Sequence, residues 1–206
     1  MLTFLDIFDY VFHHSEHKTL GQSGERFLYL ELQQNGIPRK QIFRNVYIPA
    51  FNKNGQENDK TTEIDIVVLS HKGILLFEHK AYSGKIYGDG RRKQWVQYLG
   101  SKKTYFMSPA EQNRYHRYCL QRYLKLDIPI YLFISHSQCG HWRVRNLPQD
   151  VHFLNRRGSF RQIYNQLPKI TIPIEIFNEL QQRFQTLSRP TDGTREKHIA
   201  DFSHKP

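Results

Sequence analysis

Two short segments of the sequence, Glu63-Ile64-Asp65 and Glu78-His79-Lys80, place charged side chains at the edges of apolar runs that span residues 64–69 and 74–77. Near-continuous apolar runs of this length are typical of strands in a sheet that is covered on both faces. Charged groups inside such strands are costly unless they are paired or bind a cation. The pattern therefore predicts a site where carboxylates and a lysine do chemistry.

The register of the two runs decides which charges meet. If the runs form an antiparallel hairpin with its turn at residues 70–73, Asp65 faces Glu78 and Glu63 faces Lys80. Side chains opposed in this way have Cβ atoms about 4.5–5.5 Å apart on one face of the sheet. Two carboxylates at that separation repel each other unless a proton or a metal lies between them, and Mg²⁺ or Mn²⁺ suits such oxygen ligands.

A second interpretation needs no metal. Asp65 and Glu78 could lie at strand ends in solvent, while Glu63 and Lys80 form an ordinary cross-strand ion pair. A turn of three residues would also shift the register and break the pairing. Under the first interpretation, Lys80 shares the face of Glu78, where an ammonium group can orient an attacking water or stabilise negative charge on a phosphate.

The charge of the chain favours a polyanionic partner. Its 206 residues include 30 lysines and arginines against 19 acidic residues, a net charge of +11. Neutralising phosphates releases counterions, so a basic protein binds nucleic acid without sequence preference. The excess is concentrated in residues 85–126, and we expect nucleic-acid contacts from Lys85, Arg91, Arg92, Lys93, Trp95, Lys102, Lys103 and Arg114.

The segment 91–98 interleaves basic and aromatic side chains. Such a strip can hold phosphates and stack Trp95 on exposed bases. Alternatively, Trp95 and Tyr98 point inward and the basic residues are solvated. The sequence has no helix-turn-helix, zinc-finger or RNA-recognition signature, so nothing in it indicates recognition of a defined base sequence.

The remaining pattern predicts an α/β fold, with a central mixed β-sheet flanked by helices on both sides. Apolar periodicity predicts helices over residues 2–14 and from a cap at Thr19 to Asn35-Gly36. Ser108-Pro109-Ala110-Glu111 combines an N-cap, a first-turn proline and a capping-box glutamate, and a last helix follows Pro173. The helix from Ser108 should run to about Lys125. Strands are expected at residues 43–48, 64–69, 74–77, 128–134 and 151–154, and an exposed loop at 52–62.

This order indicates one domain over residues 19–187, with an N-terminal helix or arm at 1–18 and a flexible tail at 188–206. The chain has only Cys119 and Cys139, which excludes a disulfide scaffold and a thiolate zinc site.

The sequence gives no sign of membrane insertion or secretion. No apolar run approaches the roughly 20 residues that a membrane span needs, and Asp6 and Asp9 in the first ten residues are foreign to a secretory signal. We therefore expect a cytoplasmic protein without a membrane partner. The sequence leaves a homodimer open.

Several of these residues form a pattern that resembles the nuclease-related domain family, called NERD, which is similar to the PD-(D/E)xK nuclease superfamily. Ser108 stands where the family usually has asparagine. The likeness runs from about Gly21 to Phe153. It rests on Gly24-Glu25, Glu63-Ile64-Asp65, Glu78-x-Lys80, Tyr82-Ser83-Gly84-Lys85-Ile86-Tyr87-Gly88 and Ser108-Pro109-x-x-Gln112.

The resemblance implies a restriction-endonuclease-like core and a role for each matching residue. It implies that Asp65 and Glu78 bind Mg²⁺ or Mn²⁺, with the backbone carbonyl of His79 as a further ligand. It also implies that Lys80 is the catalytic lysine, and that Glu25 completes the site from a helix with Gln112 beside it.

Read from the residues alone, two of these positions have a plainer interpretation. Glu25 could be an exposed acid in the first turn of a helix, where negative charge is favourable. Gln112 shares a helix face with His116, Cys119 and Tyr123, and that face could either line the site or simply pack on the sheet.

Two classes of function follow. The first is a metal-dependent nuclease that hydrolyses phosphodiester bonds of nucleic acid, with DNA as the expected substrate. The second is a non-catalytic nucleic-acid-binding or adaptor module that retains the nuclease fold. A module directed at RNA is a third reading.

Overall fold

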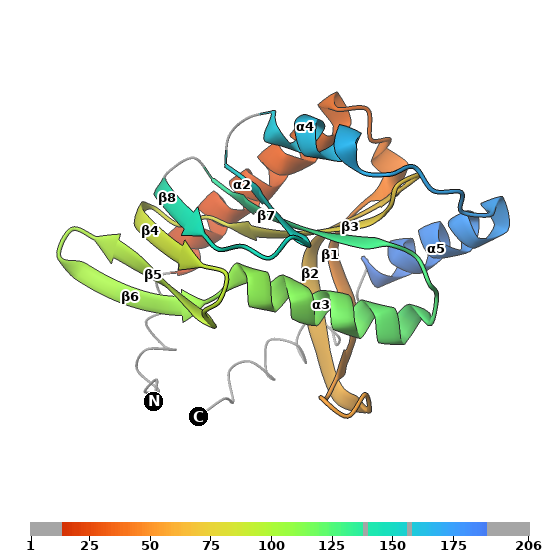
Figure 1. Ribbon diagram of the computed structural model, residues 1–206, viewed down its shortest axis with the longest axis horizontal. Helices are drawn as coiled ribbons and strands as arrows, with labels where there is room; N and C mark the ends of the chain where they lie inside the picture. Colours follow the sequence, from red (N-terminus) through yellow and green to blue (C-terminus); the bar gives the residue numbers. More distant parts are fainter. Residues whose placement is uncertain (1–13, 138–139, 156–157, 189–206) are drawn as a thin grey trace.

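The computed structural model describes residues 14–137, 140–155 and 158–188, with side chains from residue 24 onward. Nine strands form two sheets in this part of the chain (Figure 1). The larger sheet has the order β1 (Ile42–Phe51), β2 (Glu57–Ser70), β3 (Gly73–Lys80), β7 (Ile130–His136) and β9 (Val151–Leu154). The smaller has the order β6 (Lys102–Met107), β5 (Gln94–Leu99), β4 (Gly84–Asp89) and β8 (Gly140–Arg145).

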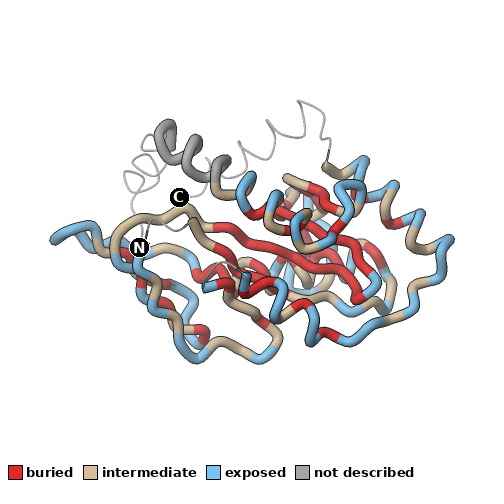
Figure 2. The backbone as a smooth tube through the Cα atoms, turned by 90° about the horizontal axis from the view of Figure 1, so that it is seen from above, coloured by how far each residue is buried: buried red, intermediate tan, exposed pale blue. Residues whose placement is uncertain are grey.

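Helices cover both faces of the larger sheet, which confirms the expected α/β fold with a mixed sheet between helices. On one face, α3 (Pro109–Leu124) and α5 (Ile174–Leu187) pack on a cluster that includes Val67, Leu76 and Leu120. On the other, α2 (His14–Gln34) and α4 (Ser159–Gln166) pack on a cluster that includes Phe77 and Phe160. A short 3₁₀ helix, η1 (Arg39–Gln41), precedes β1. The buried segments concentrate in the central strands (Figure 2).

The hairpin of β2 and β3 has the register that the sequence predicts. Its pairs run from Ser70 with Gly73 to Ile66 with Phe77, around a two-residue turn. Beyond Phe77, β3 continues in parallel pairing with β7, where Glu78 lies opposite Ile134. β2 and β3 therefore part at the charged residues, and the expected ladder pairs of Asp65 with Glu78 and of Glu63 with Lys80 are not formed.

The smaller sheet was not predicted, and it begins where the larger one ends. The parallel pairing of β3 with β7 is resumed by β4 with β8 at the same offset of 56 residues, as Lys80 with His136 and Gly84 with Gly140 show. Aromatic rings join the two sheets, since the ring of Trp142 lies 4.8 Å from His136, centroid to centroid. The sequence hides these strands because they are short and carry many polar residues.

Two glycines of the Tyr-Ser-Gly-x-Ile-Tyr-Gly run have a structural reason. Gly84 has a φ of 79°, and a Cβ there would lie 2.3 Å from the carbonyl oxygen of Tyr98. A Cβ on Gly88 would lie 2.7 Å from the indole ring of Trp95. Both positions therefore exclude larger residues, because the neighbouring strand or ring approaches too closely.

Three local expectations are wrong. Thr19 lies inside α2 and does not cap it, because the helix is already formed at His14. Residues 57–62 belong to β2, which extends the hairpin with β1 and leaves a turn at 52–56.

The first 13 residues, with most of the expected first helix, lie outside the described residues, as does the tail from residue 189.

The third wrong expectation concerns the capping of α3 at its first residues. Pro109 begins the helix as expected, but Ser108 makes no side-chain capping bond, and its hydroxyl is buried without a hydrogen-bond partner among the described residues. Glu111 pairs with Arg114 at 2.7 Å instead of completing a capping box. The proline and the packing of the helix on the sheet suffice to start it.

The remaining boundaries differ by small amounts. The strand expected at 128–134 is β7 at Ile130–His136, and β9 has the expected bounds. Helix α4 was not predicted.

Asn113 ties α3 to the centre of the larger sheet and provides a test of this packing. Its amide donates to the carbonyl oxygens of Leu76 at 3.2 Å and Phe133 at 3.0 Å. Asn113→Ala should lower the free energy of unfolding by about 1–3 kcal/mol in urea titrations, because two buried hydrogen bonds are lost. The exposed Gln121→Ala on the same helix is the control and should change it by less than about 0.5 kcal/mol. Equal effects of the two substitutions would contradict the role of Asn113.

Candidate functional site

Glu78 and Lys80 lie on β3 and face α3. Glu78 is 1% exposed, and its Oε1 atom forms an ion pair of 2.7 Å with Nζ of Lys80. Lys80 also donates to Oε1 of Gln112 at 3.1 Å. The other oxygen of Glu78, Oε2, lies 3.7 Å from Nδ1 of His116. One face of α3 therefore lines the site through Gln112 and His116, while Cys119 belongs to the core.

Asp65 enters from β2 at the point where the two strands part. Its Oδ2 accepts a hydrogen bond of 2.7 Å from the backbone N–H of His79. Burial raises the pKa of Asp65 well above its ordinary value, and the nearby charge of Glu78 raises it further. Burial also raises the pKa of Glu78, and the charge of Lys80 opposes this effect. The two carboxylates thus share one poorly solvated region and interact.

His79 points to the opposite face of the sheet, towards α2. Its Nδ1 lies 2.9 Å from Oγ of Ser135, and burial lowers its pKa to about 4, so the ring is neutral at pH 7. Gly24 packs directly on this ring, and a Cβ at residue 24 would lie 2.2 Å from Nε2. The Gly24-Glu25 pair is thereby explained in part, because the glycine lets α2 approach β3. A contact between the His79 carbonyl and a metal stays a prediction.

Glu25 reaches the site from α2, and it is already paired. Its Oε2 lies 3.7 Å from a guanidinium nitrogen of Arg44 on β1. Burial is the main reason why its pKa is raised, and the charges of Glu63 and Glu78 add to the effect. Glu25 is therefore within electrostatic reach of the other acids, on the far side of the site from α3.

Glu63 is held by β1. It lies opposite Tyr47, and Asn45 donates to its Oε1 at 2.9 Å. Asn45 has a φ of 52°, a left-handed conformation that asparagine adopts more readily than most residues. An irregularity in β1 thus lies beside the fork between β2 and β3.

The acids can be tested for their fit to a metal ion. Oε2 of Glu78 is buried and has no hydrogen-bond partner within the described residues. The ionised form of Asp65 is disfavoured by burial and by the charge of Glu78. In the parts of the chain that the structure describes, no three acidic, histidine or cysteine side chains are grouped as a metal site would need. Binding of Mg²⁺ or Mn²⁺ by Asp65 and Glu78 therefore stays a prediction, in which two carboxylates hold the ion and water and phosphate oxygens are its other ligands.

The expected nucleic-acid contacts divide into two groups. Trp95 is 1% exposed, and its indole N–H donates to the carbonyl oxygen of Asp89 at 3.1 Å. It cannot stack on a base, so that prediction is wrong. The inward alternative holds for Trp95 but not for Tyr98, which is half-buried and lies on the other face of β5 by strand alternation. Arg114 is bound to Glu111 and lies 3.8 Å from Asp150. The other six predicted residues are exposed: Lys85, Arg91, Arg92, Lys93, Lys102 and Lys103.

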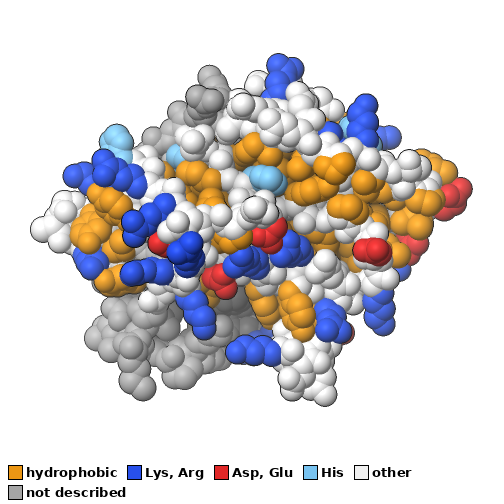
Figure 3. Space-filling view, viewed as in Figure 1, with side chains coloured by type: hydrophobic (Ala, Val, Ile, Leu, Met, Phe, Trp, Pro, Cys, Tyr) orange, Lys and Arg blue, Asp and Glu red, His pale blue; other side chains and the backbone are white. Residues whose placement is uncertain are grey.

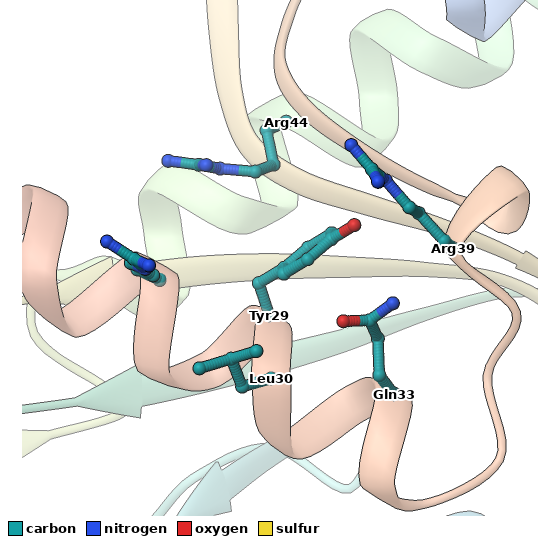
Figure 4. Close-up of a pocket in the computed structure, with 6 residues that line it drawn as sticks. Tyr29, Leu30, Gln33, Arg39 and Arg44 are labelled. Carbon is teal, nitrogen blue, oxygen red and sulfur yellow. The ribbon is translucent and has the colours of Figure 1, made fainter.

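A second basic region lies beside Glu25. An open pocket of about 400 Å³ between α2, η1 and β1 is lined by the arginines 26, 39 and 44, together with Tyr29, Leu30 and Gln33. In Figure 4 the labelled Arg44 extends from β1 and the labelled Arg39 from η1, both above Tyr29, and none of the described residues that line the pocket carries a carboxylate. This pocket places positive charge next to the acids of the site.

Sequence reasoning missed Arg44, Asn45 and Ser135. A signal existed for the first two, because Arg44-Asn45 interrupts the apolar pattern of a predicted strand with two consecutive polar residues. Ser135 at the end of an apolar run gives no comparable signal, since serine is common at strand ends.

The fold and the site define an α/β protein with a nuclease-like core. A family model described as nuclease-related domain (NERD) matches residues 20–137, so the chain belongs to this family. An uncharacterized protein of Bacillus anthracis is 27% identical over 194 residues, which cover 91% of this chain and 85% of that protein. No solved structure matches the chain with significance. None of the helices in the described residues is long and apolar enough to span a membrane.

The raised pKa of Asp65 predicts how the stability of the metal-free protein depends on pH. An acid whose pKa is higher in the folded state opposes folding once the pH rises above its unfolded value of about 3.9, and the full cost is present above the folded pKa. In EDTA, Asp65→Asn should therefore raise the melting temperature by a few degrees at pH 8, and this gain should fade towards pH 4.

The exposed Asp59 on the same strand is the control. Asp59→Asn should leave the melting temperature unchanged within about one degree at both pH values, because surface substitutions of this kind have small effects. A gain for Asp65→Asn that persists undiminished at pH 4 would contradict the assignment.

Proposed function

We propose that this protein is a metal-dependent phosphodiesterase that acts on nucleic acid, with DNA as the expected substrate. The observation that carries the proposal is the meeting of Asp65, Glu78 and Lys80 in one poorly solvated site, in a chain of the nuclease-related domain family. Buried acids with raised pKa values beside a lysine are typical of functional sites.

The residues divide the work as follows. Asp65 and Glu78 would hold Mg²⁺ or Mn²⁺, which supplies positive charge to polarise a phosphoryl oxygen. The hydrogen bond from the His79 amide fixes the orientation of Asp65. Lys80 would donate to negative charge that develops on the phosphate, and Gln112 keeps its ammonium group in place. The exposed lysines and arginines of residues 85–103 would hold the backbone.

A second candidate is the non-catalytic binding module. It is favoured by two observations on the described residues: Lys80 is already held by Glu78 and Gln112, and the acids form no group of three metal ligands. A module of this kind would use the same basic surface and would bind nucleic acid without turnover.

A cleavage assay separates the two candidates. Purified protein is incubated with supercoiled, linear and single-stranded DNA in Mg²⁺ or Mn²⁺, and with the same DNA in EDTA. The proposal predicts metal-dependent cleavage that falls at least about 100-fold in Glu78→Gln, because a ligand of the cation is weakened, and in Lys80→Ala, because the ammonium group that donates to the phosphate is lost. Lys60→Ala, an exposed lysine on β2, is the matched control and should cleave as the wild type does.

Background cleavage that is equal in wild type and in both variants would remove the enzyme proposal. If DNA binding then persists in Glu78→Gln and weakens steeply with salt, the binding module is the correct function.

A further inference from the structure

The smaller sheet presents one open face, and its register decides which side chains lie there. Side chains alternate between the two faces of a strand. Trp95, Gln97 and Ile86 are buried on the inner face. The residues one position away therefore point outward, and pairing aligns Tyr87 with Val96, Val96 with Tyr105, and Tyr98 with Lys103.

Three tyrosines lie together on this outer face. Tyr105 is 52% exposed and Tyr87 is 38% exposed. The rings of Tyr87 and Tyr98 meet edge to face, with centroids 5.7 Å apart. In the parts of the chain that the structure describes, the rings of Tyr87 and Tyr105 are exposed and that of Tyr98 is half-buried.

Basic groups lie among the tyrosines. Nζ of Lys103 is 4.8 Å from the ring centroid of Tyr105 and 5.8 Å from that of Tyr98. The guanidinium of Arg143, on β8, is 6.0 Å from the ring centroid of Tyr87. Lys85 is opposite Tyr98 on the neighbouring strand. Figure 3 shows hydrophobic and basic side chains side by side at the end of the molecule that Figure 1 labels β4, β5 and β6.

Acidic groups are scarce on the same face. By alternation from Tyr87, Asp89 lies on it at the end of β4. Its carboxylate accepts hydrogen bonds from Arg145 at 3.2 Å and from Asn146 at 3.1 Å. The face as a whole is therefore positive, with aromatic rings spaced between the charges.

We propose that this tyrosine face, defined by Tyr87, Tyr98 and Tyr105 with Lys85, Lys103 and Arg143, binds single-stranded nucleic acid. Unpaired bases stack on accessible rings, whereas bases inside a duplex are already stacked on each other. The neighbouring cations neutralise the phosphates between successive bases. The proposal deepens the proposed function by naming the form of substrate, and it rests on that function only for the nature of the polymer.

The location of the face relates it to the candidate site. Lys80 ends β3, and β4 begins four residues later at Gly84. A single-stranded nucleic acid bound along β4 would therefore reach the point where β2 and β3 part within a few nucleotides. Single-stranded DNA and single-stranded RNA offer the same stacking chemistry, so the experiment compares both.

The test measures the fluorescence anisotropy of labelled oligonucleotides with the full chain in EDTA, where cleavage cannot interfere. The probes are a single-stranded DNA of 15 nucleotides, its duplex and the RNA of the same sequence. Tyr87→Leu/Tyr105→Leu should weaken binding of the single strands at least about tenfold, because stacking is worth about this much or more per base. Duplex binding should change by less than about twofold.

Matched variants separate stacking from general damage. Tyr87→Phe/Tyr105→Phe keeps the rings and should bind single strands as the wild type does. Phe27→Leu removes an exposed aromatic ring on α2, which is not part of the smaller sheet, and should also bind normally. Thermal melting of each variant checks that the fold is retained.

Three results would overturn the proposal. The first is unchanged single-strand binding in the leucine variant, and the second is an equal loss of affinity for single strands and duplex. The third is binding of polyglutamate, a polyanion without bases, as tightly as the oligonucleotides at the same salt. The outcome of the cleavage assay is independent of these results, because single-strand binding in EDTA does not require turnover. The failure of one proposal can therefore be distinguished from the failure of the other.

Discussion

The site depends on the point at which β3 loses β2 as a neighbour. From Ile74 to Lys80, β3 pairs with β7 on one side, but β2 pairs with it on the other side only as far as Phe77. The backbone N–H of His79, which has no backbone partner on β2, donates a hydrogen bond to the carboxylate of Asp65. An unpaired backbone amide in the interior would be costly, so this bond both satisfies the strand and fixes the acid. The fork and the acid site are therefore one structural feature.

This arrangement carries a cost that the core must offset. Burial raises the pKa of Glu25, Asp65 and Glu78, which means that each carboxylate is less stable as an anion here than in water. Lys80 and Arg44 compensate only in part. The fold tolerates the acids because the apolar residues on both sides of β2 and β3 are almost completely buried. A poorly solvated group of like charges is the kind of strain that a bound cation would relieve.

The sequence predicted the hairpin register because apolar runs and a short turn leave little freedom in pairing. The helix period put Gln112 on one face with His116 but left open whether that face lines the site or packs on the sheet. The resemblance placed Gln112 beside Glu25, and in the structure it accepts a hydrogen bond from Lys80. It could not show that Trp95 points inward, because alternation along a strand leaves the choice of face open until the packing partner is known. The smaller sheet was missed because its strands are short and carry many polar residues, so that its buried residues, such as Ile86 and Trp95, form no continuous apolar run.

The central claim is that Asp65 and Glu78 together bind one divalent cation. Anomalous diffraction from crystals soaked in Mn²⁺ tests it most directly. The account predicts a single strong peak at the fork, about 2.0–2.4 Å from a carboxylate oxygen of each residue, the range typical of hard cations and oxygen ligands. A fork without such a peak in crystals that bind Mn²⁺ elsewhere, or an ion that contacts only one of the two acids, would contradict the account.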